Sequence, residues 1–279
     1  MDFSKFICPI CGKGLHQEGS SLKCEKGHCF DVAKEGYVNL LPPNFKKSQL
    51  PGDNKIMVNA RHAFLTGGYF TPLATELAEL LRGRRALLDA GCGTGWYGAT
   101  IKSVLSEEGE ALAVYGIDIS KFATARAARE GEDGVAVGSV FHLPTASGAF
   151  DSTLTVFAPT CADELYRVTR PDAIAITVNP AEKHLLELKK AMYGEATYEN
   201  PPENAQKPLV SSLGRELFAH VKTIRLTFTD TVKSNADIMA LLSMTPYYYK
   251  TNEEKKQRLS LLTELPCTFD FYVDVYKRS

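Results

Sequence analysis

Short apolar segments alternate with longer amphipathic ones through the middle of the chain. Five of the apolar segments have the length of a strand and are apolar on both faces. We predict strands over residues 86–90, 111–118, 134–138, 151–157 and 173–178. Strands of this kind, separated by helices, are typical of a parallel sheet with helices on both sides. The pattern therefore predicts an α/β fold.

Capping and helix-breaking residues delimit the predicted helices. Thr71 is a candidate N-cap with Pro72 at the first helical position, Ser120 is a second N-cap, and Pro171 is expected to end a helix. The helices are predicted over residues 54–65, 71–81, a stretch that ends near 105, 120–129, 162–170 and 182–193.

The last third of the chain breaks this alternation. Residues 194–208 are polar and rich in proline, and we predict that they form an excursion from the main fold. Strands are predicted over residues 221–229 and 267–276, with helices over 235–242 and 253–262 between them.

The first 35 residues differ from the rest of the chain. They are rich in cysteine, glycine and lysine and show little periodicity. A segment of this kind cannot build a core alone, so it needs a cross-link such as a bound metal in order to fold. Prolines and short apolar pairs then indicate an extended connector. We divide the chain into a zinc-binding module (1–35), a connector with a helix (36–70) and a main domain (71–279).

The metal assignment rests on two close pairs of ligands. Cys8 and Cys11 form a C-x2-C pair, and Cys24 and His28 form a C-x3-H pair after a short spacer. This spacing suits a tetrahedral site, and thiolates with imidazole favour zinc. Cys29 is the alternative fourth ligand, and we favour His28 because the C-x3-H spacing is common in zinc sites. Four protein ligands leave no open position, so the expected zinc is structural.

Composition and charge narrow the function classes. The 279 residues are 44% apolar and 23% charged with a formal net charge of −1, which argues against a strongly basic nucleic-acid binder. No segment approaches the ~20 apolar residues that cross a bilayer. Seven cysteines in a chain of this length do not indicate a disulfide scaffold, and the first residues do not resemble a signal peptide. We expect a cytoplasmic protein with no membrane partner.

A glycine-rich turn follows the first predicted strand of the main domain. The run Asp89-Ala90-Gly91-Cys92-Gly93-Thr94-Gly95 joins that strand to a helix, and its glycines let the backbone approach a ligand closely. Asp118 ends the next strand, where a carboxylate can accept hydrogen bonds from both ribose hydroxyls of an adenosine group. Residues 93–98 also fit G-x-G-x-x-G, so a dinucleotide is the alternative ligand.

Two features favour S-adenosylmethionine over NAD. The run at 87–95 resembles motif I of class I methyltransferases, and the strand pair at 221–229 and 267–276 resembles the hairpin that ends those domains. The resemblance implies a Rossmann-like, mostly parallel seven-stranded sheet with a C-terminal antiparallel hairpin, preceded here by a small zinc-ribbon-like domain. It also implies S-adenosylmethionine as the cofactor, together with one structural Zn²⁺ per chain.

Nearly the whole chain resembles the large-subunit ribosomal RNA guanine-N1 methyltransferases. The matching segments are Cys-Pro-x-Cys at 8–11, Cys24 and His28, 30–42, Pro51-Gly52-Asp53, Ala60-Arg61, 63–65, motif I, 157–159, 184–189 and Met244-Thr245-Pro246. The resemblance implies methylation of guanine N1 in a domain II hairpin of 23S ribosomal RNA. One branch of the family is linked to tolerance of macrolides such as tylosin. The sequence leaves open the branch, the exact guanine and whether the chain forms a homodimer.

The same resemblance implies a set of cofactor contacts. They are Tyr69, Phe70, Asp89, Gly91, Gly93, Thr94, Gly95, Trp96, Asp118, Ile119 and His184. Ser139 and Val140 are the candidate adenine contacts, although the acid that many class I enzymes carry at this place is missing.

The sequence does not identify the catalytic residues. Guanine N1 carries a proton that must leave, so a general base is expected, and His184, Asp163 and His142 are candidates. The base must also leave its stack, and Phe157 and the tyrosines at 247–249 are candidate stacking partners. Two other functions fit the same motifs: a methyltransferase for a small molecule, and an inactive methyltransferase fold that binds RNA through its zinc ribbon.

Overall fold

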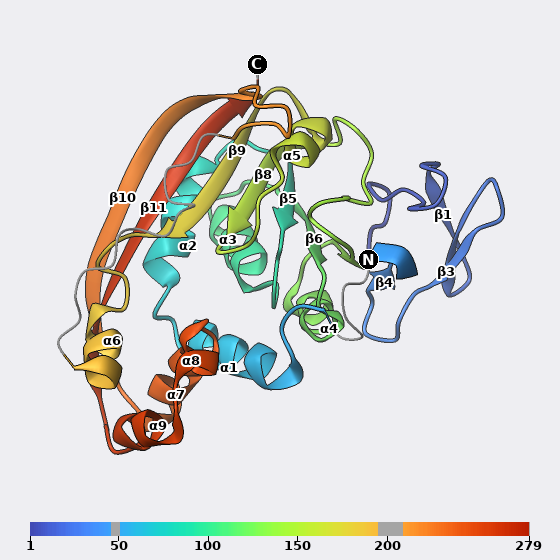
Figure 1. Ribbon diagram of the computed structural model, residues 1–279. Helices are drawn as coiled ribbons and strands as arrows, with labels where there is room; N and C mark the ends of the chain where they lie inside the picture. The colour runs from blue at the N-terminus through green and yellow to red at the C-terminus, as the bar shows by residue number, and fades with distance from the viewer. Residues whose placement is uncertain (46–50, 195–208, 279) are drawn as a thin grey trace.

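Figure 1 shows the computed structural model, which describes residues 1–45, 51–194 and 209–278. Its main feature is an eight-stranded sheet with the order β10-β11-β9-β8-β5-β6-β7-β4. The strands are β4 (Val38–Asn39), β5 (Ala86–Ala90), β6 (Ala113–Asp118), β7 (Gly134–Val137), β8 (Phe150–Val156), β9 (Thr169–Pro180), β10 (Phe218–Val232) and β11 (Leu265–Arg278). Of the predicted excursion at 194–208, residues 195–208 lie outside the described residues.

Seven of these strands form the predicted sheet. Neighbours from β9 to β7 are parallel, whereas β11 is antiparallel to both β9 and β10. The eighth strand, β4, comes from the connector, and its Val38 and Asn39 pair in parallel with Ala136 and Val137 of β7. The sequence indicated only an extended segment here, because two residues are too few to show a period.

The helices surround this sheet. They are α1 (Lys55–Thr66), α2 (Thr71–Leu80), α3 (Trp96–Glu107), α4 (Lys121–Glu130), α5 (Ala162–Val168), α6 (Leu186–Tyr193), α7 (Asn235–Ser243), α8 (Tyr247–Lys250) and α9 (Glu253–Ser260). The Asn54 side chain caps α1 by accepting from the N–H groups of Ile56 and Met57, and Ser120 caps α4. Within the described ranges, no helix is long and apolar enough to cross a membrane.

Consecutive residues of the central strand β5 enter two different cores. Leu87 packs in the core that α1, α2, α3 and the C-terminal helices cover, whereas Leu88 packs in the core on the opposite face. On that second face, residues 138–149 cross from β7 to β8 without a helix. Phe3, Phe6 and Leu22 of the N-terminal module belong to the core there. The module therefore occupies the place where a crossover helix usually lies.

The N-terminal module is a small antiparallel sheet at one end of the molecule, beside β4 (Figure 1). Its strands are β1 (Leu15–Glu18), β2 (Ser21–Cys24) and β3 (Cys29–Asp31). The N–H of Ile7 donates to the carbonyl of Pro144 at 2.9 Å, and the hydroxyl of Tyr115 donates to the carboxylate of Asp2. Phe6 is 1% exposed and packs edge-on against Tyr115. The module thus shares a core with the main domain.

Two helix boundaries differ from the prediction at their N-termini. Thr71 is the first residue of α2 rather than its N-cap, which is Phe70. The helix predicted from residue 182 begins at Leu186, because the preceding backbone is tied to β11. The N–H of Ala181 donates to the carbonyl of Asp270, and the N–H of Lys183 donates to its carboxylate.

One predicted helix is too long at its C-terminus. The helix predicted over 162–170 ends at Val168, and Thr169 already belongs to β9, where it pairs with Phe150. The Thr169 hydroxyl donates to the carbonyl of Leu165 at 2.6 Å and closes the last turn. Proline at 171 is therefore not the stop signal; it lies inside the strand.

Candidate functional site

The predicted metal ligands come from two knuckles of similar backbone geometry. In the first, the N–H of Gly12 donates to the carbonyl of Cys8, and in the second the N–H of Gly27 donates to the carbonyl of Cys24. Gly12 and Gly27 have φ of +71° and +81°, which residues with a side chain rarely adopt. Each glycine turns the chain back after its cysteine, so that the two ligand pairs face each other.

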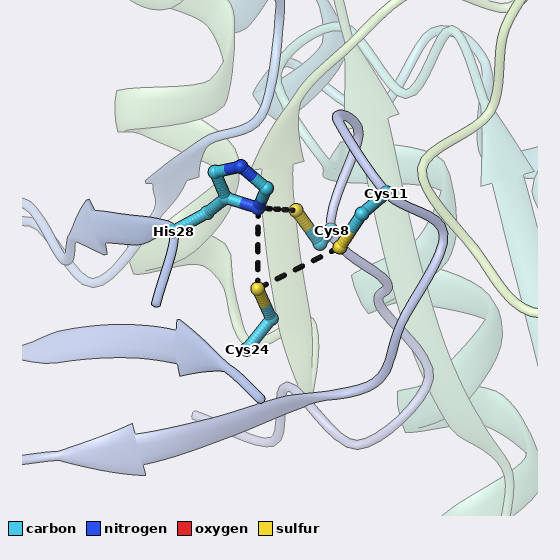
Figure 2. A group of neighbouring side chains, drawn as sticks. All are labelled: Cys8, Cys11, Cys24 and His28. Atoms are coloured by element: carbon cyan, nitrogen blue, oxygen red, sulfur yellow. Dashed lines mark hydrogen bonds between the residues drawn. The ribbon is translucent and has the colours of Figure 1, made fainter. Parts of the chain in front are cut away.

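Figure 2 shows that the four side chains point toward one another. The Nδ1 atom of His28 lies 3.4 Å from Sγ of Cys8 and 3.3 Å from Sγ of Cys24, and the Sγ atoms of Cys11 and Cys24 are 3.7 Å apart. A tetrahedron with metal–sulfur bonds of about 2.3 Å has edges of about 3.8 Å. The donor chemistry and the spacing therefore fit zinc. The exposed Cys29 lies outside this group.

The glycine-rich turn joins β5 to α3. Gly91, Gly93 and Gly95 all have positive φ, at +83°, +55° and +79°. A β-carbon on Gly95 would lie 2.8 Å from Cα of Ala127, so only glycine fits where α3 crosses α4. Trp96 begins α3 with its ring against Tyr97. The turn therefore brings its backbone to the carboxyl ends of β5 and β6, where open sheets bind ligands.

Asp118 ends β6 directly beside this turn. Its carboxylate accepts from the N–H of Gly93 at 3.0 Å and from the N–H of Ser120 at 2.7 Å. Burial raises the pKa of Asp118, and the two backbone donors oppose that rise. Two oxygens fixed by backbone donors still have lone pairs for the hydroxyls of a ribose. Ile119 follows, and its side chain lies under Gly52 of the connector.

Several buried polar atoms around the turn have no hydrogen-bond partner among the described residues. They are Oδ2 of Asp89, Oγ1 of Thr94 and the hydroxyl of Tyr97. Asp89 and Thr94 are each 1% exposed. Buried polar groups are normally paired, so such a set around one loop indicates a polar ligand or water there. An adenosine joined to a charged amino-acid end fits this set.

Glu132 was not predicted, although it lies in the middle of this group. Its carboxyl occupies a slot opposite Gly116 and Gly98, where a β-carbon on Gly116 would lie 1.9 Å from Oε2. Burial, together with the charges of Asp89 and Asp118, raises the pKa of Glu132 well above its usual range. The sequence signal for it was Gly116 inside the apolar strand β6, because a glycine within a strand often marks a place where another group approaches the backbone closely.

We expect S-adenosylmethionine to bind roughly tenfold more tightly at pH 7.5 than at pH 6. Burial, reinforced by the charge of Asp118, raises the pKa of Asp89 to about 7. At pH 6 the acid is mostly protonated and attracts the cofactor's ammonium and sulfonium charges poorly. Without cofactor, the same raised pKa lowers the free energy of unfolding as the pH rises from about 4 toward 7.

Isothermal titration calorimetry over this pH range measures the effect. Asp89→Asn should bind weakly with little dependence on pH, whereas Asp133→Asn, which removes a carboxylate paired with Lys102, serves as the matched control and should keep the dependence. A wild-type affinity that stays constant from pH 6 to 7.5 would contradict the role of Asp89.

Tyr69, Phe70 and His184 form a second wall of the site. The Tyr69 hydroxyl donates to Asp237 at 3.0 Å, so it ties α1 and α2 to α7. Phe70 is 1% exposed, and its ring centroid lies 6.3 Å from that of His184. Phe157, after β8, lies with its ring nearly parallel to His184, with centroids 6.1 Å apart. The aromatic rings thus surround His184 next to the ends of β8 and β11.

His184 has a defined protonation state. Burial, with the charge of Lys189 acting in the same direction, lowers the pKa of His184 to about 3. Its Nδ1 accepts from the backbone N–H of Asp270 at 3.4 Å, so we assign the proton of the neutral ring to Nε2. A ring with this pKa is neutral near pH 7, and its Nε2–H group can donate a hydrogen bond.

The other predicted site residues lie apart from His184. Ser139 is 8% exposed at the end of β7, where its hydroxyl accepts from the N–H of Phe141, and Val140 follows it. His142 packs against Phe45 with centroids 4.3 Å apart, beside the zinc module. Asp163, in the first turn of α5, accepts from the N–H of Ser212 at 2.8 Å. The structure thus does not place the three base candidates together.

Comparison with known proteins agrees with this geometry. Residues 6–49 match the family described as RlmA, N-terminal, a zinc ribbon, and residues 83–256 match the family described as a methyltransferase domain. The domain uses S-adenosylmethionine, and the Cys/His group is a structural zinc site.

Two curated relatives cover much of the chain. The Bacillus subtilis protein named "Putative 23S rRNA (guanine-N(1)-)-methyltransferase YxjB" is 33% identical over 99% of this chain and 96% of that protein. The 23S rRNA (guanine(748)-N(1))-methyltransferase of Streptomyces fradiae is 39% identical over 66% of each chain. With its zinc ribbon, its methyltransferase domain and this full-length similarity, the chain belongs to the family of 23S rRNA guanine-N1 methyltransferases.

Proposed function

We propose that the chain transfers a methyl group from S-adenosylmethionine to N1 of a guanine in 23S ribosomal RNA. The observation that carries the proposal is the contact between the glycine-rich turn and the loop after β8. A β-carbon on Gly91 would lie 2.5 Å from Cβ of Ala158, so glycine lets the two loops touch. The names of the two relatives supply the acceptor, guanine N1 of 23S RNA.

The loop after β8 has the strained backbone of a functional site. Phe157 has a φ of +53°, and Leu185, next to His184, has a φ of +56°. Non-glycine residues in this region cost about 1–3 kcal/mol each and persist where the surroundings hold them. Both residues border the aromatic rings around His184. We place the target base there, after it has left its stack in the RNA.

The bound cofactor supplies the methyl group as an electrophile on its sulfonium. Phe157 and the rings beside it orient the base and exclude water, which is much of the catalysis that such a displacement needs. The N1 proton passes to a water molecule as the N1–methyl bond forms and the sulfonium–methyl bond breaks, and its loss places negative charge on guanine O6. The Nε2–H group of His184 is the donor that we assign to this oxygen. Because burial lowers the pKa of His184 to about 3, we assign it the role of a hydrogen-bond donor rather than that of the base for N1.

Replacement of His184 by alanine is expected to lower kcat by about 10²-fold and to change the Kd for S-adenosylmethionine much less, although the family resemblance implies that His184 also contacts the cofactor. Removal of one donor to a developing anion has effects of this size. Single-turnover methylation and calorimetry separate the two quantities. His220→Ala, on the exposed strand β10, is the matched control. An unchanged kcat, or a loss that appears only in the cofactor Kd, would refute the donor role.

We propose that the zinc module contributes part of the RNA-binding surface. A hollow of about 250 Å³ lies between the first zinc knuckle and the main domain, and Pro9, Phe45, His142 and Arg167 are among the residues that line it. Phe45 and the neighbouring Phe141 are exposed aromatic side chains, which suit stacking on unpaired bases.

Transfer of tritium from labelled S-adenosylmethionine tests the function. We expect label in naked 23S ribosomal RNA and, after digestion, in 1-methylguanosine. Label confined to a small-molecule extract would establish the alternative of a small-molecule methyltransferase. RNA binding without cofactor binding would establish the inactive fold.

The target nucleotide and the cellular compartment are also proposals. We place the target guanine in the domain II hairpin and the reaction in the cytoplasm, where ribosomal RNA is modified. Mass mapping of domain II from cells with and without the gene identifies the nucleotide, and an unchanged hairpin would refute the placement. A tylosin sensitivity test in the same strains shows whether the modification confers macrolide tolerance. Sedimentation of the purified chain decides whether it is a homodimer.

A further inference from the structure

Three segments of the family resemblance meet at Arg61 on α1: residues 51–53, 60–61 and 244–246. The proposed reaction assigns no role to any of them. The Nε and Nη2 groups of Arg61 donate to Oδ2 of Asp53 at 3.1 and 2.8 Å, and Nη2 also donates to the carbonyl of Met244 at 3.2 Å. Helix α1 lies between α4 on one side and α7 on the other (Figure 1). Arg61 therefore joins the connector to the C-terminal helices.

This junction lies directly over the cofactor turn. The Cδ atom of Arg61 would be 3.7 Å from a β-carbon on Gly93, which is ordinary van der Waals contact. On the other side, a β-carbon on Gly52 would lie 2.9 Å from the side chain of Ile119. The hydroxyl of Ser120 donates to the carbonyl of Asp53 at 2.6 Å. The connector thus covers the end of β6, and Arg61 borders the glycine-rich turn.

The guanidinium is held in place but keeps a free donor group. Asp53 and Met244 use Nε and Nη2, whereas Nη1 donates to no other residue in the described part of the chain. The Arg61 side chain is 24% exposed. Burial raises the pKa of Asp118, and the positive charge of Arg61 opposes this rise, so the guanidinium is electrostatically close to the site. A donor fixed in this way is preorganised for an anion.

The charges of the site show which anion fits. Asp89, Asp118 and Asp53 suit the sulfonium and ammonium groups of S-adenosylmethionine, but they repel its carboxylate. We propose that Arg61 binds this carboxylate directly through Nη1, and that Asp53 and the Met244 carbonyl are the positioning groups that hold the guanidinium in that pose. This inference rests on the use of S-adenosylmethionine and is independent of the RNA substrate.

Arg61→Met, titrated with S-adenosylmethionine and with decarboxylated S-adenosylmethionine, tests the inference. The wild-type chain should prefer the carboxylate-bearing form by about 10- to 100-fold, the range for a hydrogen bond to a charged group. Arg61→Met should lose this factor for S-adenosylmethionine and bind the decarboxylated form as the wild type does. Both ligands are read by calorimetry, without RNA.

Two further variants keep the test decisive. Arg82→Met removes an arginine that pairs with Glu79 and Glu108 on the surface, and it should bind both ligands normally. Arg61→Lys keeps the charge and should restore part of the preference even if the methionine variant folds poorly. An equal loss for both ligands in Arg61→Met and Arg61→Lys would show that Arg61 only braces the fold. Unchanged affinity would also overturn the inference.

Discussion

Replacement of Asp118 by alanine is expected to weaken S-adenosylmethionine binding by at least about 100-fold. The carboxylate ends β6 with its oxygens fixed by the N–H groups of Gly93 and Ser120. Each hydrogen bond from a ribose hydroxyl to a carboxylate contributes about 1.5–3 kcal/mol, so the loss of two such bonds corresponds to roughly 10²- to 10⁴-fold in Kd. The variant also releases the glycine-rich turn from the end of β6. Calorimetry with S-adenosylmethionine gives the Kd directly.

Asp133→Asn is the matched control for this prediction. Asp133 also accepts from a backbone N–H, that of Val114, and it pairs with Lys102. It directly precedes β7 and contacts the start of β6, at the opposite end of that strand from the glycine-rich turn. We expect its replacement to leave the cofactor Kd within threefold of the wild type. A similar Kd for Asp118→Ala would mean that the adenosine does not bind at the end of β6.

Loss of zinc from the module is expected to destabilise the main domain as well as the module. In Cys24→Ser, the zinc site loses a ligand and the module loses the folding energy that metal binding supplies. Phe3, Phe6 and Leu22 then no longer cover β6 and β7 reliably. Exposure of three such side chains costs about 5 kcal/mol or more, which corresponds to roughly 10–20 °C in Tm for a domain of this size. Calorimetric scanning and metal analysis measure the two effects together.

Cys29→Ser is the control, because it removes a neighbouring, exposed thiol that lies outside the zinc group. We expect full zinc content and an unchanged Tm in this variant, and loss of zinc in His28→Ala. At 15 °C, below the transition, Cys24→Ser should still bind S-adenosylmethionine within about threefold of the wild type but should not methylate RNA. A zinc-free variant that melts with the wild type would show that the module does not support the core.

The sheet could be predicted because its central strands are apolar on both faces. Leu87 and Leu88 enter different cores, and only a strand covered on both sides gives such a run. The errors arose where a distant contact fixes the backbone. Leu186 begins its helix late because Asp270, on β11, holds the preceding residues. No local pattern carries that information.

The site residues also differ in whether local sequence or the complete fold brings them together. Cys8, Cys11, Cys24 and His28 are grouped by local spacing, so the sequence could predict the group that the structure brings together. Glu132 has no motif around it, and only the folded chain brings it to Asp89 and Gly116. Arg61 and Met244 are 183 residues apart, so their contact also depends on the complete fold.

The crossover from β7 to β8 without a helix limits which segments of this chain can be exchanged with those of a relative. Residues 138–149 and the side chains of Phe3, Phe6 and Leu22 fill one layer of the molecule together. A chimera that takes only residues 1–35 from a relative would place foreign side chains against this chain's Tyr115 and Leu143. A chimera that exchanges the crossover at the same time keeps the layer intact. The smallest exchangeable unit is therefore discontinuous in sequence.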